Sequence, residues 1–258
     1  KFILTKRYLY FLPRKLRFKI FNIKMLKLYK TYTGNYYLPR FAFQDMIRNA
    51  IIDNKIFDNK IYEAAKDYIK EDTIVLDVGT NFGQLTILFS KCQKNVEVYS
   101  FEASRYIFEI LKKNIKINNA NVKLFNNLVG NQIEQDCFIQ KANLSSFNTY
   151  GSNKIEIIDD NINHSNLVEK VKTIKLDDIH FDKKISFMKI DVQGYDLEVL
   201  RGAKRIINAQ KMPIIFEYEK DYEKDFNYTF KDFEKFISEI DYYVKLKIDD
   251  SNYLILPN

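Results

Sequence analysis

The chain has 258 residues, of which 46% are hydrophobic, so it can bury the core of one α/β-sized domain. No apolar run approaches the ~18 residues of a membrane-spanning helix, and basic residues interrupt the N-terminus where a signal peptide would be apolar. Its two cysteines, Cys92 and Cys137, are too few for a disulfide framework. Reduced thiols favour a cytoplasmic location.

The net charge of +7 comes from the N-terminal end of the chain. Residues 1–40 contain eleven Lys or Arg, no Asp or Glu, and ten aromatic residues, whereas residues 41–258 contain 30 basic and 34 acidic residues. Such a segment could pack as a helix on the main domain with its lysines in solvent. It could also lie on an anionic membrane, contact a lipid-linked substrate or follow a phosphate backbone. No motif for nucleic acid supports the last alternative, so we expect no nucleic-acid partner.

We divide the chain into a basic, aromatic-rich and helical N-terminal extension, residues 1–60, and a main domain, residues 61–258. From residue 73, apolar strands alternate with helical segments. Strands are predicted at 73–78, 96–101, 122–126, 136–140, 173–176, 185–192 and 213–219. Helices are predicted at 82–91, 104–117, 195–208 and 230–240, and a hairpin at 242–257 closes the chain.

This alternation predicts a doubly wound α/β fold, in which a mostly parallel sheet has helices on both faces. The closing hairpin makes one edge of the sheet antiparallel. Segment 141–170 is long and polar for a connection, which indicates a binding loop or lid.

Acidic residues stand at or just beyond the carboxyl ends of four predicted strands. They are Asp77, Glu102, Asp191 and Glu217. Each alone could cap a helix or a turn. Ligands of such sheets bind at this edge, so four acids at corresponding positions favour a binding site.

The first of these strands leads into a glycine turn, within the sequence VLDVGTNFGQL (75–85). The GxxxxGK[ST] pattern of a P-loop is absent, and so is the third glycine or alanine of a dinucleotide fold. A negative charge at Asp77 would oppose a pyrophosphate and would suit the ammonium and sulfonium of S-adenosylmethionine. Glu102 can accept both ribose hydroxyls of that cofactor. NAD-binding folds place an acid there too, so an NAD(P)-dependent oxidoreductase is the alternative.

These segments resemble the FkbM-type methyltransferases, which use S-adenosylmethionine and have the class I, Rossmann-like methyltransferase fold. The resemblance covers residues 60–258 and rests on VLDVGTNFG (75–83), FEA (101–103), TIKLDDI (173–179), MKIDVQGYDLEVLRGA (188–203) and PIIFE (213–217). The fourth motif is the most specific. Mild departures from the usual family residues occur at Thr80, Phe82, Ala103 and Asp196.

The resemblance implies a seven-stranded sheet and methyl transfer to a hydroxyl of a sugar, glycan or secondary-metabolite acceptor. We assign the cofactor to the turn and the strand ends, with Asn127 or Val129 at the adenine edge. The assigned residues are Asp77, Gly79, Asn81, Gly83, Glu102, Asn127 and Val129.

A hydroxyl acceptor needs a base or a metal where it enters, because it is a poor nucleophile until its proton leaves. Asp191 is the predicted base, and Glu217 on the neighbouring strand could share the proton. A hard Mg²⁺ would suit this oxygen pair, but we assign no metal ligands. His180 is a further candidate base, although such a residue is more often exposed on a loop. A non-catalytic binding module that keeps the fold is the last alternative.

Overall fold

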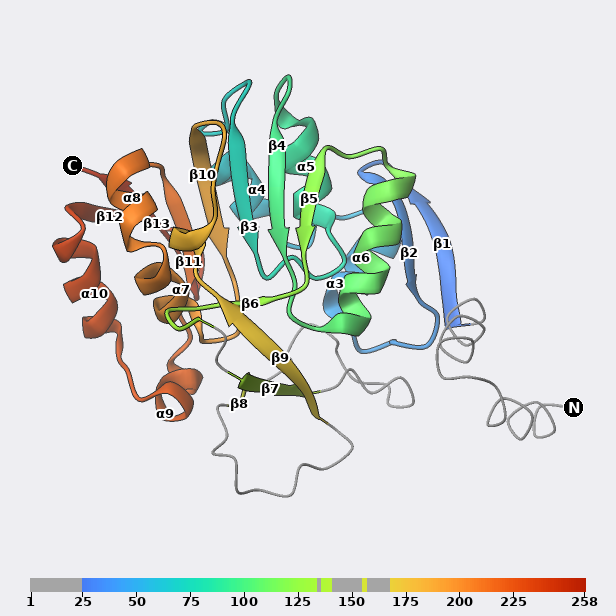
Figure 1. Cartoon of the computed structure of the whole chain (residues 1–258). Helices are drawn as coiled ribbons and strands as arrows, with labels where there is room; N and C mark the ends of the chain where they lie inside the picture. Colours follow the sequence, from blue (N-terminus) through green and yellow to red (C-terminus); the bar gives the residue numbers. More distant parts are fainter. Residues whose placement is uncertain (1–24, 134–135, 141–154, 157–167) are drawn as a thin grey trace, which may run out of the picture.

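The computed structural model describes residues 25–133, 136–140, 155–156 and 168–258 (Figure 1). Every residue assigned to the site lies within these ranges. Residues 1–24 and most of the predicted loop 141–170 lie outside them. No helix in these ranges has the length and apolarity needed to cross a membrane.

A seven-stranded sheet forms the centre, in the order β12-β13-β11-β10-β3-β4-β5. Five strands are parallel: β3 (Ile74–Val78), β4 (Glu97–Phe101), β5 (Val122–Phe125), β10 (Ile185–Ile190) and β11 (Ile214–Glu217). The hairpin of β12 (Tyr242–Lys247) and β13 (Asn252–Pro257) adds to β11 in antiparallel fashion. The predicted fold class, with its antiparallel edge, is confirmed.

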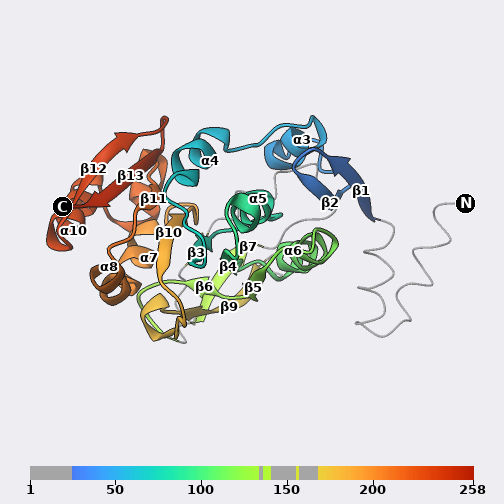
Figure 2. The ribbon, with the colours of Figure 1, turned by 90° about the horizontal axis from the view of Figure 1, so that it is seen from above.

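Helices cover both faces of this sheet (Figure 2). On β3, the side chains of Ile74, Leu76 and Val78 share a core with α7 (Asp196–Gly202), α8 (Lys204–Gln210) and α10 (Phe230–Glu239). Val75 points to the other face, where α4 (Asn59–Lys66) and α5 (Gln84–Cys92) pack. Helix α6 (Arg105–Ile117) packs beside α5. Buried strands with two covered faces explain the continuous apolar runs in the sequence.

The predicted helix 195–208 is two helices, α7 and α8, which meet at Ala203. A residue far away in the sequence binds the chain at this break. The carboxylate of Asp177, in the 3₁₀ turn Leu176–Asp178, accepts the backbone N–H groups of Arg205 and Ile206, each at 2.9 Å. These bonds satisfy the first turn of α8, which therefore begins anew.

The prediction of a helical extension is wrong for residues 26–39. They form an antiparallel hairpin of β1 (Leu26–Thr31) and β2 (Gly34–Pro39). Alternate residues of β2, Tyr36 and Leu38, are buried against α6, which is the two-residue period of a strand. The next segment, α3 (Met46–Ile52), is helical. The division at residue 60 stays a prediction, and α4 crosses it.

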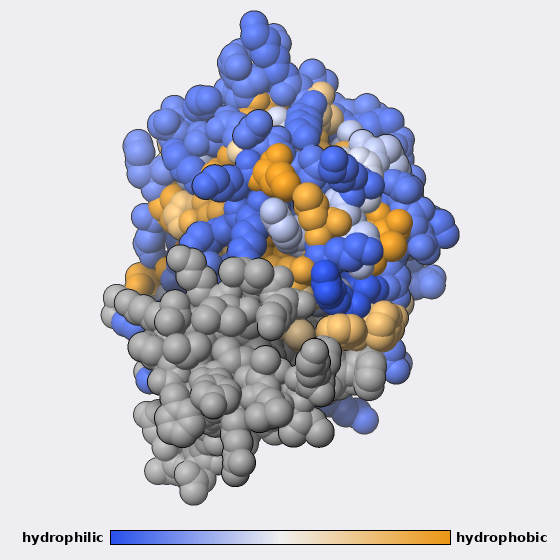
Figure 3. All heavy atoms as spheres, turned by 90° about the vertical axis from the view of Figure 1, so that its right-hand side faces the viewer, coloured by the Kyte–Doolittle hydropathy of each residue, from blue (hydrophilic) through white to orange (hydrophobic). Residues whose placement is uncertain are grey.

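Side chains of α6 fix the hairpin. Asn114 Oδ1 accepts the N–H of Tyr37 at 2.6 Å, and Asn118 Oδ1 accepts the N–H of Asn35 at 2.9 Å. Seen from the side of the hairpin, most of the described surface is hydrophilic, with separate apolar patches between (Figure 3). Phe43 and Met46, just after the hairpin, are 56% and 65% exposed.

A second, smaller sheet lies across the carboxyl ends of the central strands (Figure 1). Its order is β6 (Leu128–Val129), β9 (Val168–Ile174), β7 (Asp136–Gln140) and β8 (Ile155–Glu156). The 3₁₀ turn Lys220–Tyr222 and α9 (Glu223–Phe226) follow β11 near the same end. The chain thus builds extra structure around the edge where the sequence predicts a site.

Candidate active site

A cleft of about 560 Å³ opens at the carboxyl ends of β3, β4, β10 and β11. Strand β6 and Ile139 of β7 line one side of it. The start of α3, the residue before α4 and the turn between β12 and β13 line the other. This volume is within the range of small-molecule sites. Seven of the ten predicted site residues line the cleft: Gly79, Asn81, Glu102, Asn127, Val129, Asp191 and Glu217.

The glycine turn after β3 joins three strands at the floor of the cleft. Gly79 has a φ of +81°, and its N–H donates to the carbonyl of Phe101 on β4 at 3.0 Å. A Cβ on Gly79 would lie 1.7 Å from the carbonyl oxygen of Asp191, so only glycine fits between β3 and β10. Asn81, also at positive φ, turns its N–H toward β4.

Glu102 receives that N–H at the end of β4. Its Oε2 accepts from Asn81 N at 2.9 Å and its Oε1 from Ser104 N at 2.9 Å. Burial raises the pKa of Glu102 to about 7, although the two N–H groups act in the opposite direction. Each carboxylate oxygen keeps a lone pair for a further donor, such as a hydroxyl of a ligand in the cleft.

Asp77 does not line the cleft, so the predicted direct contact with a cationic cofactor is not what the geometry shows. Its side chain is 1% exposed and lies behind the turn. Asp77 Oδ2 accepts from Thr86 Oγ1 at 2.5 Å, and Oδ1 lies 3.8 Å from the Nζ of Lys189. Burial raises the pKa of Asp77, against the opposing effects of Lys189 and Thr86. Asp77 therefore ties α5 and β10 to β3.

Two other predicted residues also lie outside the lining of the cleft. Gly83 has a φ of +85°, and a Cβ there would come within 2.5 Å of Leu111 Cδ1, so this glycine lets α6 approach. His180 is exposed in the connection that precedes β10. Its neighbours Ile179 and Phe181 pack on the face of the sheet, and His180 does not line the cleft. The geometry supports neither a cofactor contact for Gly83 nor a catalytic role for His180.

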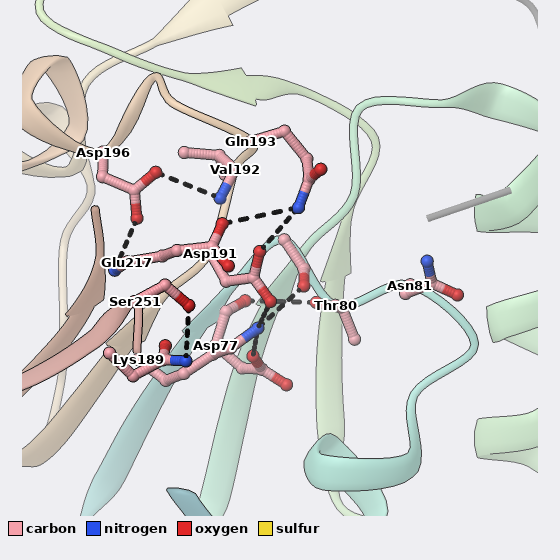
Figure 4. A network of polar contacts seen from close by, with 12 residues as sticks. Asp77, Thr80, Asn81, Lys189, Asp191, Val192, Gln193, Asp196, Glu217 and Ser251 are labelled. Atoms are coloured by element: carbon pink, nitrogen blue, oxygen red, sulfur yellow. Dashed lines mark hydrogen bonds and ion pairs between the residues drawn. The ribbon is translucent and has the colours of Figure 1, made fainter. Parts of the chain in front are cut away.

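Sequence reasoning missed Lys189, which lies between two of the predicted acids (Figure 4). Its Nζ donates to the carbonyl of Gly79 at 3.0 Å and to Asp191 Oδ2 at 3.2 Å, and its side chain is 4% exposed. Burial alone would lower the pKa of Lys189, but the carboxylates around it, first that of Asp191, raise it. A lysine inside the wholly buried strand ISFMKI was the available signal.

Asp191 and Glu217 are joined by one side chain. Gln193 Nε2 donates to Asp191 Oδ1 at 3.2 Å and to Glu217 Oε2 at 3.4 Å (Figure 4). Its Oε1 accepts from the hydroxyl of Tyr222 at 2.8 Å. Burial raises the pKa of Glu217, and the negative charges of Asp191 and Asp196 add to this effect. The structure thus brings the predicted pair together and gives its members different surroundings.

Asp196 was also missed as a residue of the site. Its carboxylate is fully buried and accepts the backbone N–H groups of Val192, at 3.3 Å, and Glu217, at 3.1 Å. These bonds hold the ends of β10 and β11 together. Asp196 therefore sets the spacing of the Asp191 and Glu217 side chains.

The geometry gives no support for Mg²⁺. Within the described ranges, no group of three or more His, Cys, Asp or Glu side chains is arranged to hold a metal ion.

Comparison with known proteins gives one match to a family model. The model described as "Methyltransferase FkbM domain" matches residues 77–244. A search of curated proteins found no match.

Solved structures with similar folds include an FkbM methyltransferase from Methylobacillus flagellatus KT, at 19% identity and a TM-score of 0.47. The similarity covers 72% of this chain and 43% of that one, so the chain spans less than half of that protein. A putative rRNA-methylase from Clostridium thermocellum is 10% identical, with a TM-score of 0.49 and 77% and 93% coverage. A putative methyltransferase from Streptococcus mutans, in complex with SAH, is 11% identical, with a TM-score of 0.46 and 76% and 94% coverage.

Proposed function

This chain belongs to the FkbM methyltransferase domain family, and on that premise we propose that it transfers a methyl group from S-adenosylmethionine to a hydroxyl. The acceptor is a sugar, a glycan or a secondary metabolite. The observation that carries the proposal is the cleft at the strand ends, where Glu102 faces the backbone of the Gly79–Asn81 turn.

The residues of this part of the cleft fit the cofactor. Glu102 is placed to accept the ribose hydroxyls, and Gly79 and Asn81 line the cleft beside it. Asn127 and Val129, which line the cleft after β5, are assigned to the adenine edge. Bound here, S-adenosylmethionine supplies an electrophilic methyl group.

The acceptor hydroxyl must lose its proton, and the surroundings of Asp191 and Glu217 suggest how. Asp191 lines the cleft, and Lys189 holds its Oδ2 at 3.2 Å, so the side chain is positioned to take the proton of the acceptor. Glu217, whose pKa is raised by burial, favours the protonated form, which can donate a hydrogen bond to the acceptor. Two carboxyl groups with different surroundings can thus divide the roles of base and donor.

Titration calorimetry tests the cofactor part of the proposal. We expect the purified protein to bind S-adenosylhomocysteine and not NADH, and Glu102→Ala to weaken the binding by about 1.5–3 kcal/mol, the scale of a charge-assisted hydrogen bond. A heat of binding with NADH and none with S-adenosylhomocysteine would support an oxidoreductase instead. Binding without methyl transfer to any acceptor in a broad panel would support the non-catalytic module.

The cytoplasmic location and the contact of residues 1–40 with an anionic membrane stay predictions. Of these forty residues, the structure describes 25–40. Sedimentation with anionic and with neutral vesicles would test the contact.

A further inference from the structure

Carboxyl groups dominate the polar lining of the cleft. Among the described residues that line it, none is Lys, Arg or His. Eight are acidic, in a protein whose net charge is +7. They are Asp45, Asp58, Glu102, Asp191, Glu217, Glu219, Asp249 and Asp250.

Six of these acids surround the part of the cleft away from Glu102, where the acceptor would enter. They come from four separate segments. Asp58 precedes α4, and Asp191 follows β10. Glu217 ends β11, and Glu219 follows it. Asp249 and Asp250 lie in the turn between β12 and β13. Two acids of the lining also serve their own segments. Asp45 caps α3 through the N–H of Arg48 at 2.7 Å. Asp249 Oδ1 accepts the N–H groups of Ser251 and Asn252 in its own turn, at 3.1 and 2.8 Å, and its charge still acts on Asp58.

The ammonium of Lys189 is not available to pair with an anionic ligand in the cleft. Its Nζ is already held by the carbonyl of Gly79 and by Asp191, and it is 4% exposed. Lys189 does not line the cleft, so an anionic acceptor would find no free cation there among the described residues. The cofactor brings a net positive charge, but this is small against the acids that remain.

Asp58 shows the consequence of this crowding. It precedes α4, yet its side chain makes no capping hydrogen bond to that helix. Burial, followed by the negative charges of Asp191 and Asp249, raises the pKa of Asp58 to about 7. The pKa of Glu219 is also raised, first by burial and then by the negative charge of Asp191. A cation in the cleft would relieve this repulsion and let the carboxyl groups ionise.

We propose that the methyl acceptor is a polyhydroxylated compound that carries a protonated amine, as an amino sugar with a free amine does. This inference rests on the proposed function and names its substrate class. The ammonium pairs with the carboxylates of the acceptor side, foremost Asp58 and Asp249, while a hydroxyl of the same molecule reaches Asp191. Phosphorylated sugars, nucleotide sugars and uronic acids are repelled by the same charges.

The test uses matched sugars and two measurements on the full chain. Glucosamine, N-acetylglucosamine and glucuronic acid share a ring and differ in charge, and galactosamine, N-acetylgalactosamine and galacturonic acid form a second trio. Binding is measured by calorimetry at saturating S-adenosylhomocysteine, and methyl transfer with labelled S-adenosylmethionine. We expect the amine of at least one trio to bind and to be labelled at least tenfold better than its neutral partner, and the acids to do neither.

Proton release gives an independent readout. Binding of the amine should release protons from the carboxyl groups, so its heat should depend on the ionisation enthalpy of the buffer. Binding of the neutral sugar should not. Asp58→Asn and Asp249→Asn should each reduce the preference for the amine severalfold, whereas Asp182→Asn, an exposed acid before β10, should leave it unchanged. Melting temperatures establish that the variants fold.

The failures can be told apart. If S-adenosylhomocysteine does not bind, the proposed function is wrong. If it binds, and the neutral or acidic sugars are bound or labelled as well as the amines, or no amine in either trio binds, the inference about the acceptor is overturned while the proposed function stands. A preference for the amine that survives both Asp58→Asn and Asp249→Asn would also overturn it.

Discussion

Lys189 and Asp77 lie opposite each other on β10 and β3, as paired residues of two parallel strands. The Nζ of Lys189 is 3.8 Å from Asp77 Oδ1, and their side chains are 4% and 1% exposed. On its other side, the same Nζ reaches Asp191 at 3.2 Å. One buried ammonium therefore links the structural acid behind the glycine turn to the proposed base at the cleft.

Removal of this ammonium should destabilise the fold. Lys189→Met keeps the length of the side chain but leaves the buried Asp77 without its cation. We expect the free energy of unfolding to fall by about 3–5 kcal/mol, the scale for breaking a buried ion pair from one side. Urea unfolding measures this loss.

The matched control removes the acid as well. Lys189→Met combined with Asp77→Asn should lose less stability than the two single changes added together, because neither partner is then left charged and alone. The contradicting result is a free energy of unfolding for Lys189→Met within about 1 kcal/mol of the wild-type value, which is the contribution of an exposed ion pair. The buried pair would then contribute little to stability.

Cofactor affinity should depend on pH through Glu102. Its pKa is raised to about 7, and only the ionised form can accept both ribose hydroxyls. Affinity for S-adenosylhomocysteine should therefore rise by about tenfold from pH 6 to pH 8. Calorimetry at three pH values measures the rise, and Glu102→Gln should flatten it. An equal rise in Glu102→Gln would assign the titration to another group.

The same shift has the opposite sign for the stability of the protein without ligand. A carboxyl group whose pKa is higher in the folded than in the unfolded state favours folding most at low pH. This contribution is lost as pH rises from about 4.5, the ordinary value, to about 7. In Glu102→Gln, we expect the melting temperature to vary less than that of the wild type over this window.

Two glycines of one turn should respond differently to alanine. Gly79→Ala places a Cβ on the backbone of Asp191, which cannot move without separating β3 from β10. Gly83→Ala meets the end of the Leu111 side chain, which can turn away. Both pay the cost of a positive φ, about 1–2 kcal/mol. Gly79→Ala should lose cofactor binding and further stability, and Gly83→Ala should keep binding. Equal effects on calorimetry and unfolding would contradict this distinction.

The regular part of the fold and three of the four acids at the strand ends could be predicted from the sequence. Strands covered on both faces are mostly apolar, so VLDV and ISFMKI are recognisable as central strands in spite of one charged residue in each. Parallel strands present their carboxyl ends at one edge, and this alone brings Glu102, Asp191 and Glu217 to one cleft.

A place near the end of a strand does not say whether a side chain reaches the cleft or is covered by a helix. Asp77 is the last residue but one of β3 and shares the face of Val75, where α5 covers it. Asp58 and Asp249 come from segments without periodicity, and only the tertiary fold brings them to the cleft. The hairpin of residues 26–39 is hard to predict, because aromatic residues stand on both faces of β2 and hide its two-residue period.

Chemistry at the carboxyl pair should be separable from cofactor binding. Asp191→Asn keeps the shape of the side chain and removes the base, so we expect turnover to fall by about 10²–10⁴. Affinity for S-adenosylhomocysteine should change little, because Glu102 and the Gly79 turn stay in place. Glu217→Gln keeps a hydrogen-bond donor toward the acceptor, so its loss of turnover should be smaller than that of Asp191→Asn.

An acceptor for this assay comes from screening hydroxyl compounds for transfer of a labelled methyl group, with the matched sugars among them. His180→Asn is the control, since His180 is exposed and does not line the cleft, and its turnover should equal that of the wild type. Full activity in Asp191→Asn would remove Asp191 from the mechanism. A larger loss in Glu217→Gln than in Asp191→Asn would exchange the two roles, and Glu217 would then be the group that takes the proton.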